Sequence, residues 1–139
     1  MPDKKKVIIV PCSGVGKPFG TITREAAYQV TEEDRPERTQ IVPLSLLVLG
    51  DEEARAALAE ADVITIDGCA LVCASKMVAE SGAQVSASFN SMDVYRANRQ
   101  YKPQGISSLN EAGLKLVGLL AEQIDAAVEK LNAEEEQDA

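Results

Sequence analysis

Histidine is absent from this chain of 139 residues. Imidazole is a common general base and the commonest metal ligand. Its absence excludes catalytic triads that use histidine, and it excludes zinc sites that have histidine ligands. A reactive or metal-binding centre must therefore be built from thiols, carboxylates, backbone groups and water. Tryptophan is absent as well, and aromatic residues make up only 4% of the chain. Val, Ile, Leu and Ala must therefore form most of the core.

Basic residues are scarce, with 14 Lys and Arg against 22 Asp and Glu and a net charge of −8. Nucleic acids and anionic membrane surfaces are bound through clusters of Lys and Arg, so the composition argues against both as partners. No segment approaches the roughly 18 consecutive apolar residues of a membrane span. The apolar stretch Val7–Val10 is too short for the hydrophobic region of a signal peptide.

Cysteine is rare too. The three cysteines form an odd number, which does not suit the paired disulfides of a secreted protein. Together with the lack of a membrane span, this predicts a cytoplasmic protein whose thiols are structural, metal-binding or reactive.

Length and charge distribution predict one domain and a short tail. A chain of this length is typical of a single domain, which we place at residues 1–132. Residues 133–139, with the sequence AEEEQDA, are strongly acidic and are expected to form a solvated helix end or a disordered tail.

Strand and helix patterns alternate along most of the chain. Four apolar segments predict β-strands, at residues 5–12, 38–44, 62–66 and 84–89. Helical periodicity and capping signals predict helices at residues 21–33, 51–61 and 69–81. Apolar strands that alternate with helices are typical of a parallel sheet covered on both faces. We therefore predict a three-layer α/β/α fold of the Rossmann or flavodoxin type, with strand order 2-1-3-4 and right-handed crossovers.

The C-terminal third begins with a polar segment, residues 90–107, that we expect to be irregular. Ser108 and Glu111 then form a capping-box pattern that predicts the start of a long amphipathic helix. One stripe of this helix is apolar, and its members are Leu109, Leu116, Val117, Leu120, Ile124, Ala127, Val128 and Leu131. Such a stripe is more often part of the core, although pairing with a second copy in a homo-oligomer is the alternative.

The predicted topology brings the three cysteines to one place. In open α/β sheets, ligands bind at the carboxyl ends of the strands where the strand order reverses, here between the first and third strands. Cys12 ends the first strand, Cys69 begins the helix after the third, and Cys73 lies one helical turn further on the same face. We therefore expect the three thiols to converge. The alternative is that each is a small buried apolar side chain.

Polar residues accompany these thiols. Asp67 ends the third strand, where it can cap the next helix or contact a metal ion or substrate. Ser13, Gly14 and Gly16 follow Cys12, and their backbone could hold a small anionic molecule. Lys76 is expected either to extend into solvent at the helix edge or to contact such an anion.

Two phosphate-binding motifs are incomplete. The segment PCSGVGK, residues 11–17, resembles a P-loop, but that motif needs Gly at position 11 and Ser or Thr at position 18, and both are Pro. The Cys-x5-Arg loop of thiol phosphatases would need Arg at position 18 as well. Nucleotide hydrolysis and phosphate-ester cleavage are therefore poorly supported.

Several segments together resemble the DGC-domain family of small prokaryotic proteins, which is named for a central Asp-Gly-Cys. The similarity rests on Cys12–Gly16, on the REAAY segment Arg24–Tyr28, and on Asp67–Cys69 followed by Cys73 and Lys76. It is clearest over residues 6–82. The resemblance implies zinc binding, because the family shares four cysteines that are taken as zinc ligands.

Cys12, Cys69 and Cys73 match three of those four cysteines, whereas the fourth position falls at about Pro43. The resemblance therefore implies either an open metal site of three thiolates, with Asp67 or a water molecule completing a tetrahedron, or a site that has weakened or been lost in this chain. Three thiolates also suit an iron–sulfur cluster or another thiophilic metal such as Cu(I). The spacing does not select among these metals.

Three functions follow from these residues. The first is a metal-binding protein, with zinc at Cys12, Cys69 and Cys73. The second is a thiol-based reductase or transferase with Cys69 as a low-pKa nucleophile, Cys73 or Cys12 as resolving thiol, and an anion loop at residues 13–16. The third is a binding module whose cysteines are merely packed.

Overall fold

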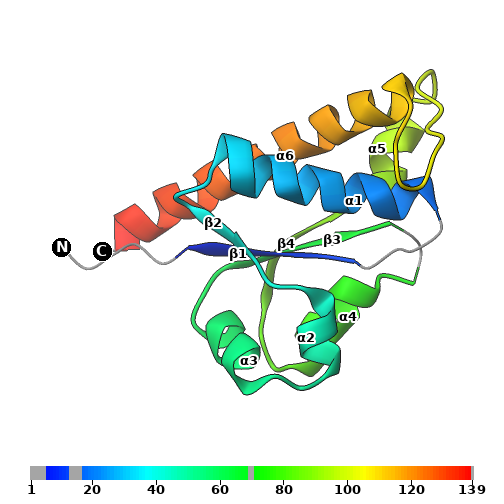
Figure 1. Ribbon diagram of the computed structural model, residues 1–139. Helices are drawn as coiled ribbons and strands as arrows, with labels where there is room; N and C mark the ends of the chain where they lie inside the picture. The colour runs from blue at the N-terminus through cyan, green and yellow to red at the C-terminus, as the bar shows by residue number, and fades with distance from the viewer. Residues whose placement is uncertain (1–5, 13–16, 69–70, 139) are drawn as a thin grey trace.

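The computed structural model of the protein describes residues 6–12, 17–68 and 71–138, the last four of these by their backbone alone (Figure 1). A four-stranded sheet lies at its centre, with every neighbouring pair parallel and the order β2-β1-β3-β4. The strands are β1 (Val7–Pro11), β2 (Thr39–Ile41), β3 (Val63–Asp67) and β4 (Val85–Asn90). The predicted three-layer fold class and strand order are confirmed.

Helices cover both faces of the sheet (Figure 1). One face is covered by α1 (Pro18–Tyr28), the π-helix η1 (Gln29–Asp34), α5 (Ser91–Ala97) and α6 (Glu111–Asp138). The other face is covered by α2 (Leu44–Val48), α3 (Glu52–Ala59) and α4 (Cys73–Glu80). Each face has its own apolar cluster, so β1 and β3 are buried along their whole length. This double burial explains why both central strands are apolar on both faces.

Proline explains two differences between the predicted and the observed element bounds. α1 begins at Pro18, three residues before the predicted helix, because the first helical position needs no free N–H group. β2 ends at Ile41 and not at residue 44. Pro43 cannot donate a ladder hydrogen bond and instead occupies the N-cap position of α2, a short helix with no clear signal in the sequence.

The expectation that residues 90–107 are irregular is wrong for the first part of this segment. α5 occupies Ser91–Ala97, and the side chain of Asn90 caps it by accepting a hydrogen bond from the Met92 N–H at 2.9 Å. Seven residues give too few turns for a clear helical period. The capping box at Ser108 is also displaced, because α6 begins at Glu111 and the Asn110 Oδ1 accepts from the Gly113 N–H at 2.8 Å.

The apolar stripe of α6 packs into the core, as most such stripes do. Leu116, Leu120, Ile124 and Val128 are fully buried against β1, β3 and α1 residues. α6 continues to Asp138 and so includes most of the acidic segment. The division into a domain at 1–132 and a tail at 133–139 stays a prediction.

Within the described part of the chain, none of the helices combines the length and hydropathy needed to cross a bilayer. The cytoplasmic location stays a prediction.

Candidate metal centre

Cys12 lies directly beyond the carboxyl end of β1, between β3 and α1. Its N–H donates to the Ile66 carbonyl at 2.8 Å, which continues the β1–β3 ladder. Its Sγ lies 3.5 Å from the Thr23 Oγ1 on α1, and the residue is only 6% exposed. The backbone and the thiol of Cys12 are therefore both held in place.

Pro43 lies at the same edge of the sheet, two residues beyond the end of the neighbouring strand β2. The β1–β2 register pairs Ile9 with Ile41, and the Val42 N–H donates to the Ile9 carbonyl at 3.1 Å. The next residue, Pro43, is exposed and precedes α2. The position expected for the family's fourth cysteine is thus at the carboxyl edge that also carries Cys12.

Asp67 ends β3 on the other side of β1 and caps α4. Its Oδ1 accepts from the Ala74 N–H at 2.8 Å, and its Oδ2 accepts from the Ser75 N–H at 3.3 Å and the Ser75 hydroxyl at 2.9 Å. The residue is 1% exposed. A carboxylate at a helix N-terminus satisfies unpaired N–H groups and is favoured by the helix dipole. Of the two roles predicted for Asp67, capping is the one that the contacts support.

Ser75 belongs to this arrangement and was missed in the sequence. Its hydroxyl bonds to Asp67 and lies 2.8 Å from the Thr65 Oγ1 on β3. The hydroxyl thus connects the end of the strand to the first turn of the helix. A hydroxyl residue a few positions after a strand-ending aspartate is a weak signal, because such residues are common on exposed helix faces.

Gly68 brings the end of β3 against the first turn of α1. A Cβ atom at this position would lie 3.0 Å from the carbonyl carbon and oxygen of Phe19 and 3.1 Å from the Gly20 nitrogen. A side chain at this position would require the α1 backbone to move away by a few tenths of an ångström, so glycine favours the close approach. Asp67 and Gly68 therefore fix the end of β3 to α4 and to α1, respectively.

The predicted helix at 69–81 begins later than expected. α4 starts at Cys73, after Val72, whose φ of 45° is left-handed and so lies outside the helix. The Asp67 cap sets this start, because it binds the N–H groups of residues 74 and 75. The expectation that one helix runs from residue 69 to residue 81 is therefore wrong, because Leu71 and Val72 are not helical. The exposed Cys73 takes the first helical position instead.

Among the other predicted site residues, the structure describes Lys76 alone. Lys76 is exposed on α4, and its contact with an anion stays a prediction. Cys69 and the anion-loop residues Ser13, Gly14 and Gly16 lie outside the described residues. Across residues 6–12, 17–68 and 71–138, no three His, Cys, Asp or Glu side chains are grouped so that they could hold a metal ion. The convergence of the three thiols therefore stays a prediction.

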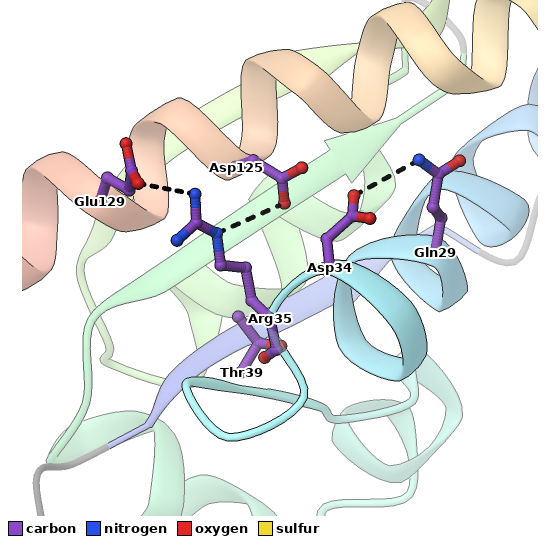
Figure 2. A network of polar contacts seen from close by, with 6 residues as sticks. All are labelled: Gln29, Asp34, Arg35, Thr39, Asp125 and Glu129. Carbon is purple, nitrogen blue, oxygen red and sulfur yellow. Dashed lines mark hydrogen bonds and ion pairs between the residues drawn. The ribbon is translucent and has the colours of Figure 1, made fainter.

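A second polar cluster joins η1 to α6 and is separate from Cys12 and Cys73. Figure 2 shows Asp34 and Arg35 facing Asp125 and Glu129 on α6. The Arg35 guanidinium lies 2.8 Å from a Glu129 oxygen and 4.0 Å from the Asp125 Oδ1. That Asp125 oxygen is buried and has no hydrogen-bond partner in the described part of the chain. Burial, and next the neighbouring Asp34 carboxyl, raise the pKa of Asp125 from 3.8 to about 7, although Arg35 opposes the shift.

This shift predicts that the protein loses stability as the pH rises from about 4 to about 7, where the folded state holds a proton that the unfolded state has lost. Asp125→Asn, which cannot ionise, should therefore flatten this part of the profile. It should raise the free energy of unfolding at pH 8 by about 1–2 kcal/mol, a value reduced for solvent screening. Urea unfolding between pH 5 and 8 measures both effects. Asp93→Asn, in an exposed pair with Arg96, is the control. An unchanged slope in Asp125→Asn would contradict the assignment.

Comparison with known proteins gives one finding. The family model described as DGC domain matches residues 8–131. The resemblance carried by Cys12, Asp67–Cys69 and Cys73 is thereby confirmed over nearly the whole chain. No curated protein and no solved structure has a significant match to it.

Proposed function

The chain belongs to the DGC domain family, and from this membership we propose that it binds a metal ion through the thiols of Cys12, Cys69 and Cys73. Zinc is the ion that we expect, and an iron–sulfur cluster or Cu(I) is the alternative for an all-thiolate site. The chain has no histidine to contribute. The site would therefore have sulfur as its only protein ligand atom.

One observation supports the proposal, namely that the elements next to Cys12 and Cys73 end or begin at one edge of the sheet. Cys12 follows β1, and Cys73 begins the helix that Asp67 of the adjacent β3 caps. Cys69 lies between Asp67 and Cys73 in the sequence. This is the edge at which open α/β sheets bind their ligands.

We further propose that a water molecule or a substrate atom takes the fourth coordination position. The Asp67 carboxylate already accepts three hydrogen bonds, which leaves about one of its four acceptor sites free. Pro43, at the fourth family position, has no side-chain donor atom. A site with three protein ligands and an open position is typical of catalytic metal centres.

Elemental analysis of protein purified without oxygen or chelator tests the proposal. We expect about one equivalent of metal per chain in the wild type and almost none in Cys69→Ser. Leu71→Ser is the matched control, because Leu71 is exposed in the same connection and has no sulfur. Its metal content should equal that of the wild type. Full metal content in Cys69→Ser would refute the three-thiol site.

The exposure of Cys73 favours a second candidate function, a thiol-based reductase or transferase. In that function Cys69 is the nucleophile and Cys73 is accessible to resolve a mixed disulfide. The metal-free protein should then contain one thiol that alkylates at pH 7 much faster than a free cysteine with a pKa of about 8.5. Three equally slow thiols would reject this candidate.

A further inference from the structure

The outward side of α6 carries a groove that the proposed metal site does not use. Its volume is about 470 Å³, and it lies between α6 and the side chains of Gln29 and Tyr101. The residues that α6 contributes are Leu114, Lys115, Gly118, Leu119 and Glu122. These positions recur every three or four residues and so lie on one face of the helix. The core stripe of α6 occupies the opposite face, so the groove faces away from the sheet.

Two residues of this groove, Leu114 and Gly118, have no structural reason in their contacts with other described residues. Leu114 is an apolar side chain with 56% of its surface exposed. A Cβ atom at Gly118 would meet nothing within 4 Å, although glycine inside a helix is less favourable than alanine. Glycine at position 113, in contrast, is explained by packing inside the chain, because a Cβ atom there would lie 3.0 Å from the Leu109 Cβ. Gly118 leaves room for close approach by something outside the chain.

The charges of the groove are complementary to those of an identical groove turned by 180°. Lys115 and Glu122 are seven residues apart, which is two helical turns. Neither forms an ion pair with another described residue. If a second α6 lay antiparallel, with the two-fold axis between Gly118 and Leu119, each Lys115 would face Glu122 of the other copy. A parallel arrangement would instead oppose lysine to lysine and glutamate to glutamate.

We propose that this groove is the surface through which two copies of the chain pair, with their α6 helices antiparallel and in contact at Gly118. In this register Glu111 faces Ala126 of the second copy, so no like charges meet across the helix pair. Each copy has a net charge of −8, but the α6 residues of the groove include one positive and one negative charge. The groove therefore repels a second copy less than an average part of the acidic surface does. Such a two-fold contact is self-complementary and closes as a dimer.

Charge reversal provides the test, with sedimentation equilibrium of the full chain as the measurement. The wild type should have twice the chain mass of 14.8 kDa. Lys115→Glu and Glu122→Lys should each raise the dimer dissociation constant at least about tenfold, because each places like charges opposite one another twice. The double variant Lys115→Glu/Glu122→Lys should restore the dimer. Lys130→Glu, an exposed charge reversal on α6 outside the groove, is the control and should leave the dimer intact.

A second variant separates the dimer from the fold. Gly118→Gln fills space that is open in the single chain, so it should leave the chain folded by circular dichroism while abolishing the dimer. A wild-type mass equal to one chain at every concentration would overturn the proposal. So would a dimer that survives both single charge reversals, since the contact would then lie on another face. Binding of a different molecule in the groove of a monomeric chain would overturn it as well.

Discussion

Asp67→Ala is expected to lower the free energy of unfolding of the metal-free protein by about 3 kcal/mol. The substitution removes three hydrogen bonds at once and leaves the N–H groups of Ala74 and Ser75 without their acceptor. Because the position is 1% exposed, water cannot easily replace the lost carboxylate. The first turn of α4 and the end of β3 should both lose order.

Asp51 provides a matched control for this prediction, because it also caps a helix with its carboxylate. Its Oδ2 accepts a single hydrogen bond, from the Ala54 N–H at 2.9 Å, at a half-buried position. Asp51→Ala should therefore cost only about 1 kcal/mol. Urea unfolding with chelator and reductant present compares the two variants without any contribution from bound metal. Equal losses would show that the additional contacts of Asp67 contribute nothing to stability.

The same residue separates a capping role from a metal-ligand role. Asp67→Asn retains one acceptor for the Ala74 N–H but has no negative charge to offer a cation. If the carboxylate only caps α4, this variant should be less stable than the wild type and still bind a full equivalent of metal. Loss of metal from the folded variant would instead make Asp67 the fourth ligand.

The fold could be predicted because its central features are local in the sequence. The strands around Ile9 and Ile64 are apolar on both faces, and this pattern indicates a covered parallel sheet. The start of α4 could not be predicted, because its cap is Asp67, seven residues before the first N–H group that it binds. Capping side chains are normally sought within three residues of a helix start. The N-cap residue of α4 is Val72, whose side chain has no hydrogen-bond acceptor.

In the candidate site and the second polar cluster as well, features set by topology could be predicted, whereas contacts between residues far apart in the sequence could not. Topology alone brings Cys12 and the end of β3 to one edge of the sheet, as predicted. The Asp34–Asp125 cluster was not predicted, because its carboxyl groups are about ninety residues apart in sequence and meet only after α6 packs against η1. Each of these residues, taken alone, resembles the many other acidic residues on this surface.

Gly68→Ala should lower the free energy of unfolding by about 2 kcal/mol, and Gly68→Val by more. The new Cβ would lie 3.0 Å from the backbone of Phe19, closer than van der Waals contact allows. This backbone cannot move freely, because the Phe19 carbonyl accepts from the Ser91 hydroxyl at 2.9 Å. The Gly20 carbonyl likewise accepts from the Thr23 hydroxyl at 2.6 Å. Relief of the clash must therefore displace α1 or break one of these bonds.

The same substitution at Gly118 should instead raise the free energy of unfolding. There the added methyl group meets nothing within 4 Å, so Gly118→Ala gains helix propensity of up to about 1 kcal/mol. Unfolding of both variants at concentrations low enough to keep the chain monomeric measures the difference directly. If Gly68→Ala were as stable as Gly118→Ala, close backbone approach would not be why glycine occupies position 68. If it is destabilised as expected, two residues of the Asp-Gly-Cys triplet have structural roles, and only the Cys69 thiol is left for the chemistry.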